Sequence, residues 1–192
     1  MDALFFLNST LLGVGLAMDA FSVSCADGLN EPHMKRSRMA LIAGIFAVFQ
    51  TIMPLLGWFC VKSVISVFSL LEVFIPWTAL ILLSFIGGKM VYSGIKNKDS
   101  DTEAPAVSIA ALLLQGIATS IDALSVGFTV SKLNLTEAVI ESLIIGAVTF
   151  IICTAGLLIG KKFGTVLSGK ASVLGGTILI IIGLQIFIKG II

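Results

Sequence analysis

Long apolar stretches separated by short polar segments make up most of the chain. Six of these stretches hold about the 20 apolar residues that a helix needs to cross the hydrocarbon core of a membrane. They are Leu4–Cys25, Met39–Cys60, Ser69–Tyr92, Val107–Val130, Ala138–Gly160 and Val173–Ile192. The pattern predicts an all-α integral membrane protein with six transmembrane helices.

The composition agrees with a membrane environment. Hydrophobic residues make up 57% of the chain and charged residues only 12%, whereas soluble domains contain roughly 25% charged residues. The net charge is +1, and no segment combines basic and aromatic residues as a nucleic-acid-binding surface does. The first span contains Asp19 and follows no basic segment, so we interpret it as a retained helix and not as a signal peptide.

The distribution of lysine and arginine predicts the orientation of the helices. Most of the 12 basic residues fall in the first, third and fifth connections. These are Lys35, Arg36, Arg38, Lys89, Lys96, Lys98, Lys161, Lys162 and Lys170, and the opposite side has only Lys62, Lys132 and Lys189. Because cytoplasmic loops are rich in lysine and arginine, we expect these three connections in the cytoplasm and both termini outside.

Two segments of the chain have nearly the same sequence. Met18–Val23 (MDAFSV) matches Ile121–Val126 (IDALSV) at a separation of 103 residues, and Thr51 matches Thr154 at the same separation. The repeat predicts two three-helix halves, residues 1–97 and 98–192. Since three is an odd number, the second half must enter the membrane inverted, an architecture that many transporters share. Chance similarity between apolar helices is the alternative.

Each copy of the repeat places an aspartate inside an apolar helix. A carboxylate at the centre of a bilayer costs at least ~2.5 kcal/mol, so such residues face a partner or a watery cavity. Asp19 and Asp122 are related by the repeat and are expected to converge between the halves. Two carboxylates neutralise one divalent cation. A purely structural role, in which the aspartates hold helices together through hydrogen bonds, is the alternative.

Oxygen-bearing residues lie close to the two aspartates in the sequence and also in the second and fifth predicted spans. The candidate ligands are Ser22, Gln50, Thr51, Thr119, Ser125 and Thr154. Hard cations such as Mg²⁺ and Mn²⁺ favour oxygen ligands over thiolates. No histidine lies in a span, and Cys25, Cys60 and Cys153 lack CxxC spacing, which disfavours zinc and copper and indicates inert thiols. Close packing of small side chains is the alternative role of each serine and threonine.

Asp27 lies eight residues after Asp19, at the cytoplasmic end of the first span. It is a candidate for lining a cytoplasmic entrance to the site. A solvated acid at the membrane interface is the alternative interpretation of this residue.

Several motifs together resemble the MntP family of bacterial manganese efflux pumps. They are the two aspartate motifs, Gln50–Trp58 (QTIMPLLGW), Ile86–Met90 (IGGKM) and Leu174–Gly176 through Gly183–Gln185. The resemblance covers essentially the whole chain and implies a manganese exporter of the inner membrane. It also implies that the intramembrane aspartates of the family correspond to Asp19 and Asp122. Gln50 departs from the family pattern, in which an acidic residue is frequent.

The sequence favours a secondary transporter over an enzyme. No GxxxxGK[ST] phosphate loop is present, and no nucleophile–base pair or metalloprotease motif appears in the spans or loops. We therefore expect proton antiport through the two aspartates, with manganese as substrate and no cofactor. The alternatives are export of another divalent cation, a small organic cation or an amino acid, and a non-transporting scaffold. Glycine-rich helix faces are compatible with a homodimer.

Overall fold

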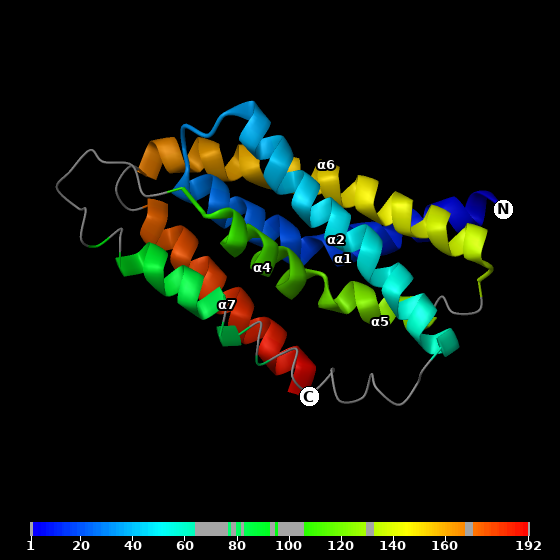
Figure 1. Ribbon diagram of the computed structural model, residues 1–192. Helices are drawn as coiled ribbons and strands as arrows, with labels where there is room; N and C mark the ends of the chain where they lie inside the picture. Colours follow the sequence, from blue (N-terminus) through cyan, green and yellow to red (C-terminus); the bar gives the residue numbers. More distant parts are fainter. Residues whose placement is uncertain are drawn as a thin grey trace.

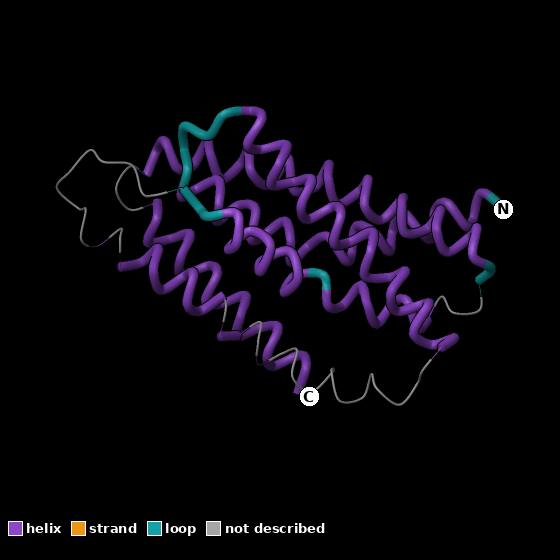
Figure 2. Tube along the Cα trace, in the orientation of Figure 1, coloured by secondary structure: helices purple, strands orange, loops and turns teal. Residues whose placement is uncertain are grey.

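The computed structural model describes residues 2–63, 77, 80–81, 83–92, 95, 106–129, 133–167 and 171–191. Its helices are α1 (Ala3–Asn30), α2 (Arg36–Ser63), α4 (Ile109–Thr119), α5 (Ile121–Thr129), α6 (Leu135–Leu167) and α7 (Ala171–Ile191) (Figure 1). Residues 83–92 are also helical, and the described part of the chain contains no strand (Figure 2). The prediction of an all-helical protein is confirmed for these residues.

Three described helices are long and apolar enough to cross a membrane. They contain the segments Ala3–Asn30, Arg36–Cys60 and Leu135–Thr165, and α4 with α5 adds a fourth span if the bent pair is counted as one. The apolar part of α7, Val173–Ile188, is shorter. Most of the predicted span Ser69–Tyr92 lies outside the described residues.

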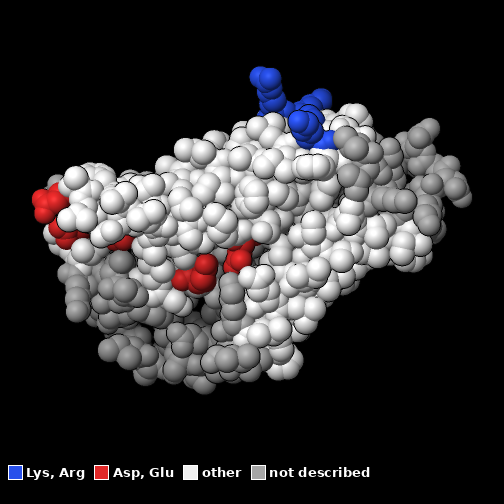
Figure 3. Space-filling view, turned by 180° about the vertical axis from the view of Figure 1, so that it is seen from behind, with Lys and Arg blue, Asp and Glu red and all other residues white. Residues whose placement is uncertain are grey.

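The helices form an elongated bundle (Figure 1). Helices α1 and α6 run in one direction, while α2 and the α4–α5 pair run in the other. The connection between α1 and α2, the start of α4 and the end of α6 lie at the same end of the bundle, and the N-terminus lies at the opposite end. The lysines and arginines of the described residues gather at one edge of the face in Figure 3, and Lys35, Arg36 and Lys162 are exposed.

Glycines bring the helices into close contact. The most extensive contacts are α1 with α6, followed by α2 with α6 and α2 with α5. A Cβ atom on Gly160 would collide with the Cys25 carbonyl of α1, and one on Gly57 would collide with the Leu124 carbonyl of α5. Membrane helices approach closely where small residues line their interface, so these glycines set the spacing of both pairs.

The outside of the bundle is apolar. Large hydrophobic side chains on different helices, including Leu4, Phe85 and Ile151, are more than 60% exposed. A surface of this kind is unfavourable in water and is expected of helices that face lipid.

Candidate metal site

The helix that carries Asp122 is broken just before the aspartate. The sequence predicted one continuous span over Val107–Val130, whereas α4 ends at Thr119 and α5 begins at Ile121, with a bend of 42°. The hydroxyl of Ser120 donates to the carbonyl of Gly116 (2.7 Å), and that of Thr119 donates to the carbonyl of Gln115 (2.9 Å). Side-chain bonds of this kind to the preceding turn bend helices.

The matching helix in the first copy of the repeat is not broken. The positions equivalent to Thr119 and Ser120 are Leu16 and Ala17, which have no hydroxyl groups. Helix α1 runs without interruption through Asp19. The two copies of the aspartate motif therefore differ in local structure, and the broken copy is the one with hydroxyl groups at these two positions.

Gln50 connects the two copies of the motif. Its side-chain Nε2 donates to the carbonyl oxygen of Leu16 in α1 (3.2 Å) and to that of Thr119 in α4 (3.1 Å). Each acceptor lies three residues before an aspartate, Asp19 in one case and Asp122 in the other. Gln50 is therefore placed between equivalent points of the two repeats.

The side chain of Gln50 also has an oxygen that accepts no hydrogen bond. The side chain is 0% exposed, and Oε1 has no hydrogen-bond partner. Pro54 lies inside α2 and has no N–H, so it cannot donate the helical bond that the Gln50 carbonyl would otherwise accept. The side-chain oxygen Oε1 of Gln50 is thus suited to a ligand that needs an acceptor.

The aspartates are more accessible than Gln50. Asp19 is half-buried and Asp122 is exposed, with Oδ1 of Asp122 accepting a hydrogen bond from the N–H of Ala123 (2.9 Å). Leu16, two residues before the first motif, and Ala123, in the second, share a buried cluster with Ile145 of α6. Residues in or beside the two motifs therefore share one part of the core. Acidic side chains also show in the middle of the face in Figure 3.

The predicted hydroxyl ligands bond to their own helices. Ser22 donates to Met18, Thr51 to Ala47, Thr119 to Gln115 and Thr154 to Phe150 through bonds to the carbonyl four residues earlier. Ser22, Thr51 and Thr154 are half-buried, Thr119 is buried and Ser125 is exposed. A hydroxyl that donates in this way keeps its lone pairs for another partner. Thr51 also lies against Gly146 of α6.

The described residues contain no group of three histidine, cysteine, aspartate or glutamate side chains that could hold a metal ion. A metal at the two aspartates would therefore need neutral oxygen ligands as well, from Gln50, hydroxyl groups, carbonyl groups or water. Oxygen ligands of this kind suit Mg²⁺, Ca²⁺ and Mn²⁺.

Asp27 lies in the interior and not at a solvated interface. It is 0% exposed, and its Oδ1 accepts a hydrogen bond from Nε2 of Gln115 in α4 (3.2 Å). The interpretation of Asp27 as a solvated acid is wrong for this structure. Its role at a cytoplasmic entrance stays a prediction.

Sequence reasoning missed two buried polar residues in the spans. Gln115 is 0% exposed, and its Oε1 has no partner; Glu141 in α6 is 7% exposed, and its Oε2 has none. Each is a lone amide or acid in an apolar stretch, which is the same signal that identified the two aspartates.

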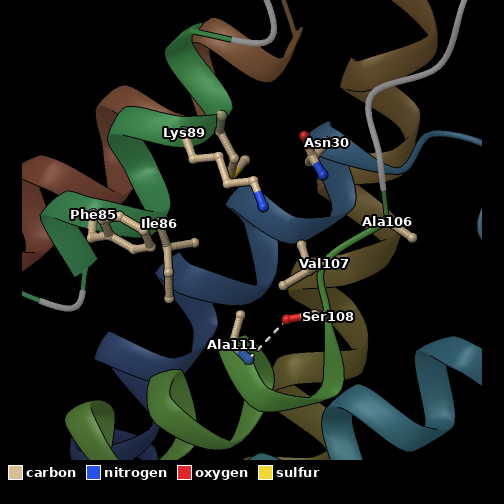
Figure 4. Close-up of a pocket in the computed structure, with 9 residues that line it drawn as sticks. Asn30, Phe85, Ile86, Lys89, Ala106, Val107, Ser108 and Ala111 are labelled. Atoms are coloured by element: carbon tan, nitrogen blue, oxygen red, sulfur yellow. Dashed lines mark hydrogen bonds between the residues drawn. The ribbon is translucent and has the colours of Figure 1, made fainter.

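A pocket lies near Asp27, at the same end of the bundle as the α1–α2 connection. Its wall includes Asn30 of α1, Lys89 and Met90 of residues 83–92, and Val107 and Ser108 at the start of α4. The Lys89 amine projects between Asn30 and Val107 in Figure 4. Asn30 follows Asp27 by three residues, so the pocket ends about one helical turn from Asp27.

The ion pair of Glu31 and Arg38, which we call the Glu31–Arg38 clamp, lies at the same end of the bundle. The guanidinium of Arg38 donates to both carboxylate oxygens of Glu31 (2.6 and 2.9 Å) and to the Val107 carbonyl. The Val107 N–H donates to Glu31 (2.7 Å). This pair therefore joins the α1–α2 connection to the segment that leads into α4.

Known proteins resemble the chain over most of its length. A family model described as "Putative manganese efflux pump" matches residues 33–187. Proteins with that name and the symbol MntP include one from Ruminiclostridium cellulolyticum, 42% identical over 93% of each chain, and one from Crocosphaera subtropica, 40% identical over 97% of each. No solved structure matches the chain significantly. The chain therefore belongs to the MntP family, which is named for manganese efflux.

Proposed function

We propose that this protein exports manganese(II) from the cytoplasm and that Asp19 and Asp122 bind the metal. The observation that carries the proposal is the position of Gln50, whose amide bonds to Leu16 and Thr119. Each of these residues lies three positions before the aspartate of one motif. The names of the relatives, manganese efflux pumps, support the choice of metal.

The chemistry of the site suits a hard divalent cation. The carboxylates of Asp19 and Asp122 would supply the two negative charges, and Oε1 of Gln50 would supply a neutral ligand. The further ligands proposed are the hydroxyls of Ser22, Thr51, Thr119, Ser125 and Thr154, with water. Gln50 brings no charge, so the two aspartates alone would balance the charge of the metal.

The proposed architecture has six spans in two inverted halves, residues 1–97 and 98–192. The pairing of helices supports it: α1 of the first half packs on α6 of the second, and α2 of the first packs on α5 of the second. The exposed Lys35 and Arg36, at the start of α2, and Lys162, near the end of α6, lie at the same end of the bundle. The proposal puts that end in the cytoplasm of a bacterium and both termini outside the cytoplasmic membrane.

Export needs a driving force because the membrane potential opposes it. Moving one charge against 100 mV costs about 2.3 kcal/mol, so a divalent cation requires about twice that free energy. Proton antiport supplies this energy if entering protons and leaving metal compete for the same two carboxylates. Metal and protons would then bind in alternation as the halves open to one side or the other.

Expression in a manganese-sensitive bacterium that lacks its own exporter tests the function. The chain should lower cellular manganese, measured by elemental analysis, and restore growth in high manganese. Asp19→Asn and Asp122→Asn should each abolish both effects, whereas Asp2→Asn, at an exposed position, should not. If both variants were expressed at the wild-type level and still protected the cells from manganese, the two aspartates would have a structural role.

A further inference from the structure

Asp27 is a buried carboxylate near one end of the bundle. It is 0% exposed, its Oδ1 accepts the single bond from Gln115 Nε2, and its Oδ2 has no hydrogen-bond partner. Asp27 forms no ion pair with a described residue. Burial of an unpaired charge is strongly unfavourable, so the carboxylate of Asp27 must bind either a proton or a positive ligand.

Two neighbouring cations, Arg38 and Lys161, donate to other groups. Arg38 donates to Glu31 through two nitrogens and also to the Val107 carbonyl. Lys161, whose backbone lies against Gly28, directs its ammonium group to the Met34 carbonyl (2.8 Å). None of the described side chains at this end of the bundle forms an ion pair with Asp27.

Gln115, which bonds to Asp27, also carries an acceptor oxygen that could bind a cation. Gln115 uses its N–H₂ group on Asp27, and its own Oε1 has no partner although the side chain is 0% exposed. The buried side-chain atoms without partners among the described residues are all oxygens. Carboxylate and amide oxygens are ligands for hard divalent cations.

A chain of buried groups connects Asp27 with the site at Gln50. The backbone carbonyl of Gln115 accepts from the Thr119 hydroxyl, and the Thr119 carbonyl accepts from Gln50. Side-chain oxygens without partners lie at both ends of this chain, on Asp27 and Gln115 at one end and on Gln50 at the other. The pocket at Asn30 lies about one helical turn beyond Asp27, toward the end that carries the basic connections.

We infer that Asp27 and Gln115 form a second binding site for a hard divalent cation, between the Asn30 pocket and Gln50. This inference rests on the proposed function, because it gives the exported metal a first position on its way to Asp19 and Asp122. Lys89 lies in the pocket, but its side chain is exposed and long enough to turn toward solvent as a cation enters.

Counting bound manganese tests the inference. The full chain in lipid nanodiscs is titrated with Mn²⁺ up to millimolar concentration, and free Mn²⁺ is measured from its electron paramagnetic resonance signal. The Asp19→Asn/Asp122→Asn double variant should still bind one Mn²⁺, and adding Asp27→Asn should remove it. An asparagine at position 27 can still accept the bond from Gln115, so the fold should survive. Asp2→Asn is the matched control.

Each comparison answers a different question. Wild type against the double variant reports on the proposed site at Asp19 and Asp122. The double variant with and without Asp27→Asn reports on the second site alone, whatever the first comparison shows. Equal Mn²⁺ binding with and without Asp27→Asn would overturn the inference.

Gln115→Glu tests whether an added negative charge at the second site strengthens Mn²⁺ binding. A second carboxylate beside Asp27 should tighten Mn²⁺ binding in the double variant at least tenfold. It should also make thermal unfolding more sensitive to added Mn²⁺ than in the parent, because the two acids repel each other without metal. A purely structural role of Gln115 gives no tighter binding, and that result would overturn the assignment.

Discussion

At the scale of single residues, Gln50 performs two tasks with one side chain. Its nitrogen holds Leu16 of α1 and Thr119 of α4, while its buried oxygen has no donor. The first property is structural, and the second suits a cation. Substitutions can separate the two, because loss of the amide affects stability even when no metal is present.

Gln50→Leu should destabilise the protein by about 1–3 kcal/mol, since it removes the hydrogen bonds to two buried carbonyl groups. Thermal or denaturant unfolding in detergent without metal measures the change. Gln185→Leu is the matched control, because Gln185 lies exposed on α7 and should change stability by less than about 0.5 kcal/mol. Equal effects of the two substitutions would contradict the bridging role of Gln50.

The sequence draws attention to some polar residues of the spans and not to others, for a physical reason. Asp19, Asp122 and Gln50 stand out because polar groups are rare in apolar spans. Gln115 and Glu141 have the same character, yet neither belongs to the repeated motif that directed attention to the aspartates. The burial of Asp27 could not be predicted, since it depends on how α4 packs against the end of α1.

At the scale of helices, the bend at Ser120 shows what hydropathy cannot predict. A hydropathy pattern treats Val107–Val130 as one span, because a hydroxyl that bonds to its own backbone changes the mean hydropathy little. The bonds from Thr119 and Ser120 to the preceding turn nonetheless accompany the 42° bend. The pairing of α1 with α6 likewise depends on glycine contacts between distant segments.

Gly57→Ala should weaken the contact between α2 and α5 and destabilise the protein by about 1–3 kcal/mol through overpacking. The new Cβ would meet the backbone of Leu124 and Gly127, which cannot move aside as a flexible side chain can. Gly44→Ala in the same helix is the control. A Cβ there meets nothing within 4 Å, so unfolding should show a gain of about 0.5–1 kcal/mol. Similar losses at both positions would argue against close packing at Gly57.

The Glu31–Arg38 clamp should contribute a coupling energy of about 1–3 kcal/mol, the range for hydrogen bonds to charged groups. A double-mutant cycle with Glu31→Gln and Arg38→Gln, read by thermal unfolding, measures it. Arg36→Gln, at an exposed position, is the control and should show no coupling to Glu31. Coupling below about 0.3 kcal/mol would mean that the clamp does not hold this end of the bundle together.

At the scale of the whole molecule, the division into two inverted halves stays a prediction. The sequence predicts two related halves, and the structure pairs helices from different halves, α1 with α6 and α2 with α5. Which helices pair could not be predicted from the repeat alone, because several arrangements of six helices keep the same symmetry. The orientation in the membrane is a separate proposal and needs its own test.

Cysteine labelling in intact cells tests the orientation. In a variant whose native Cys25, Cys60 and Cys153 are replaced by alanine, a membrane-impermeant maleimide should label Asp2→Cys but not Lys35→Cys or Lys162→Cys. All three positions are exposed, so permeabilised cells should label every variant. Labelling of Lys35→Cys in intact cells would reverse the proposed topology.

The most direct test of the proposed function is manganese flux in proteoliposomes that contain the purified chain, with internal pH recorded. We predict manganese movement opposite to protons, faster than that of magnesium, calcium or zinc, and at least about tenfold slower in both Asp19→Asn and Asp122→Asn. A tenfold effect corresponds to about 1.4 kcal/mol, and Asp2→Asn should show none. Manganese flux at the wild-type rate in both variants, or flux without proton movement, would contradict the account.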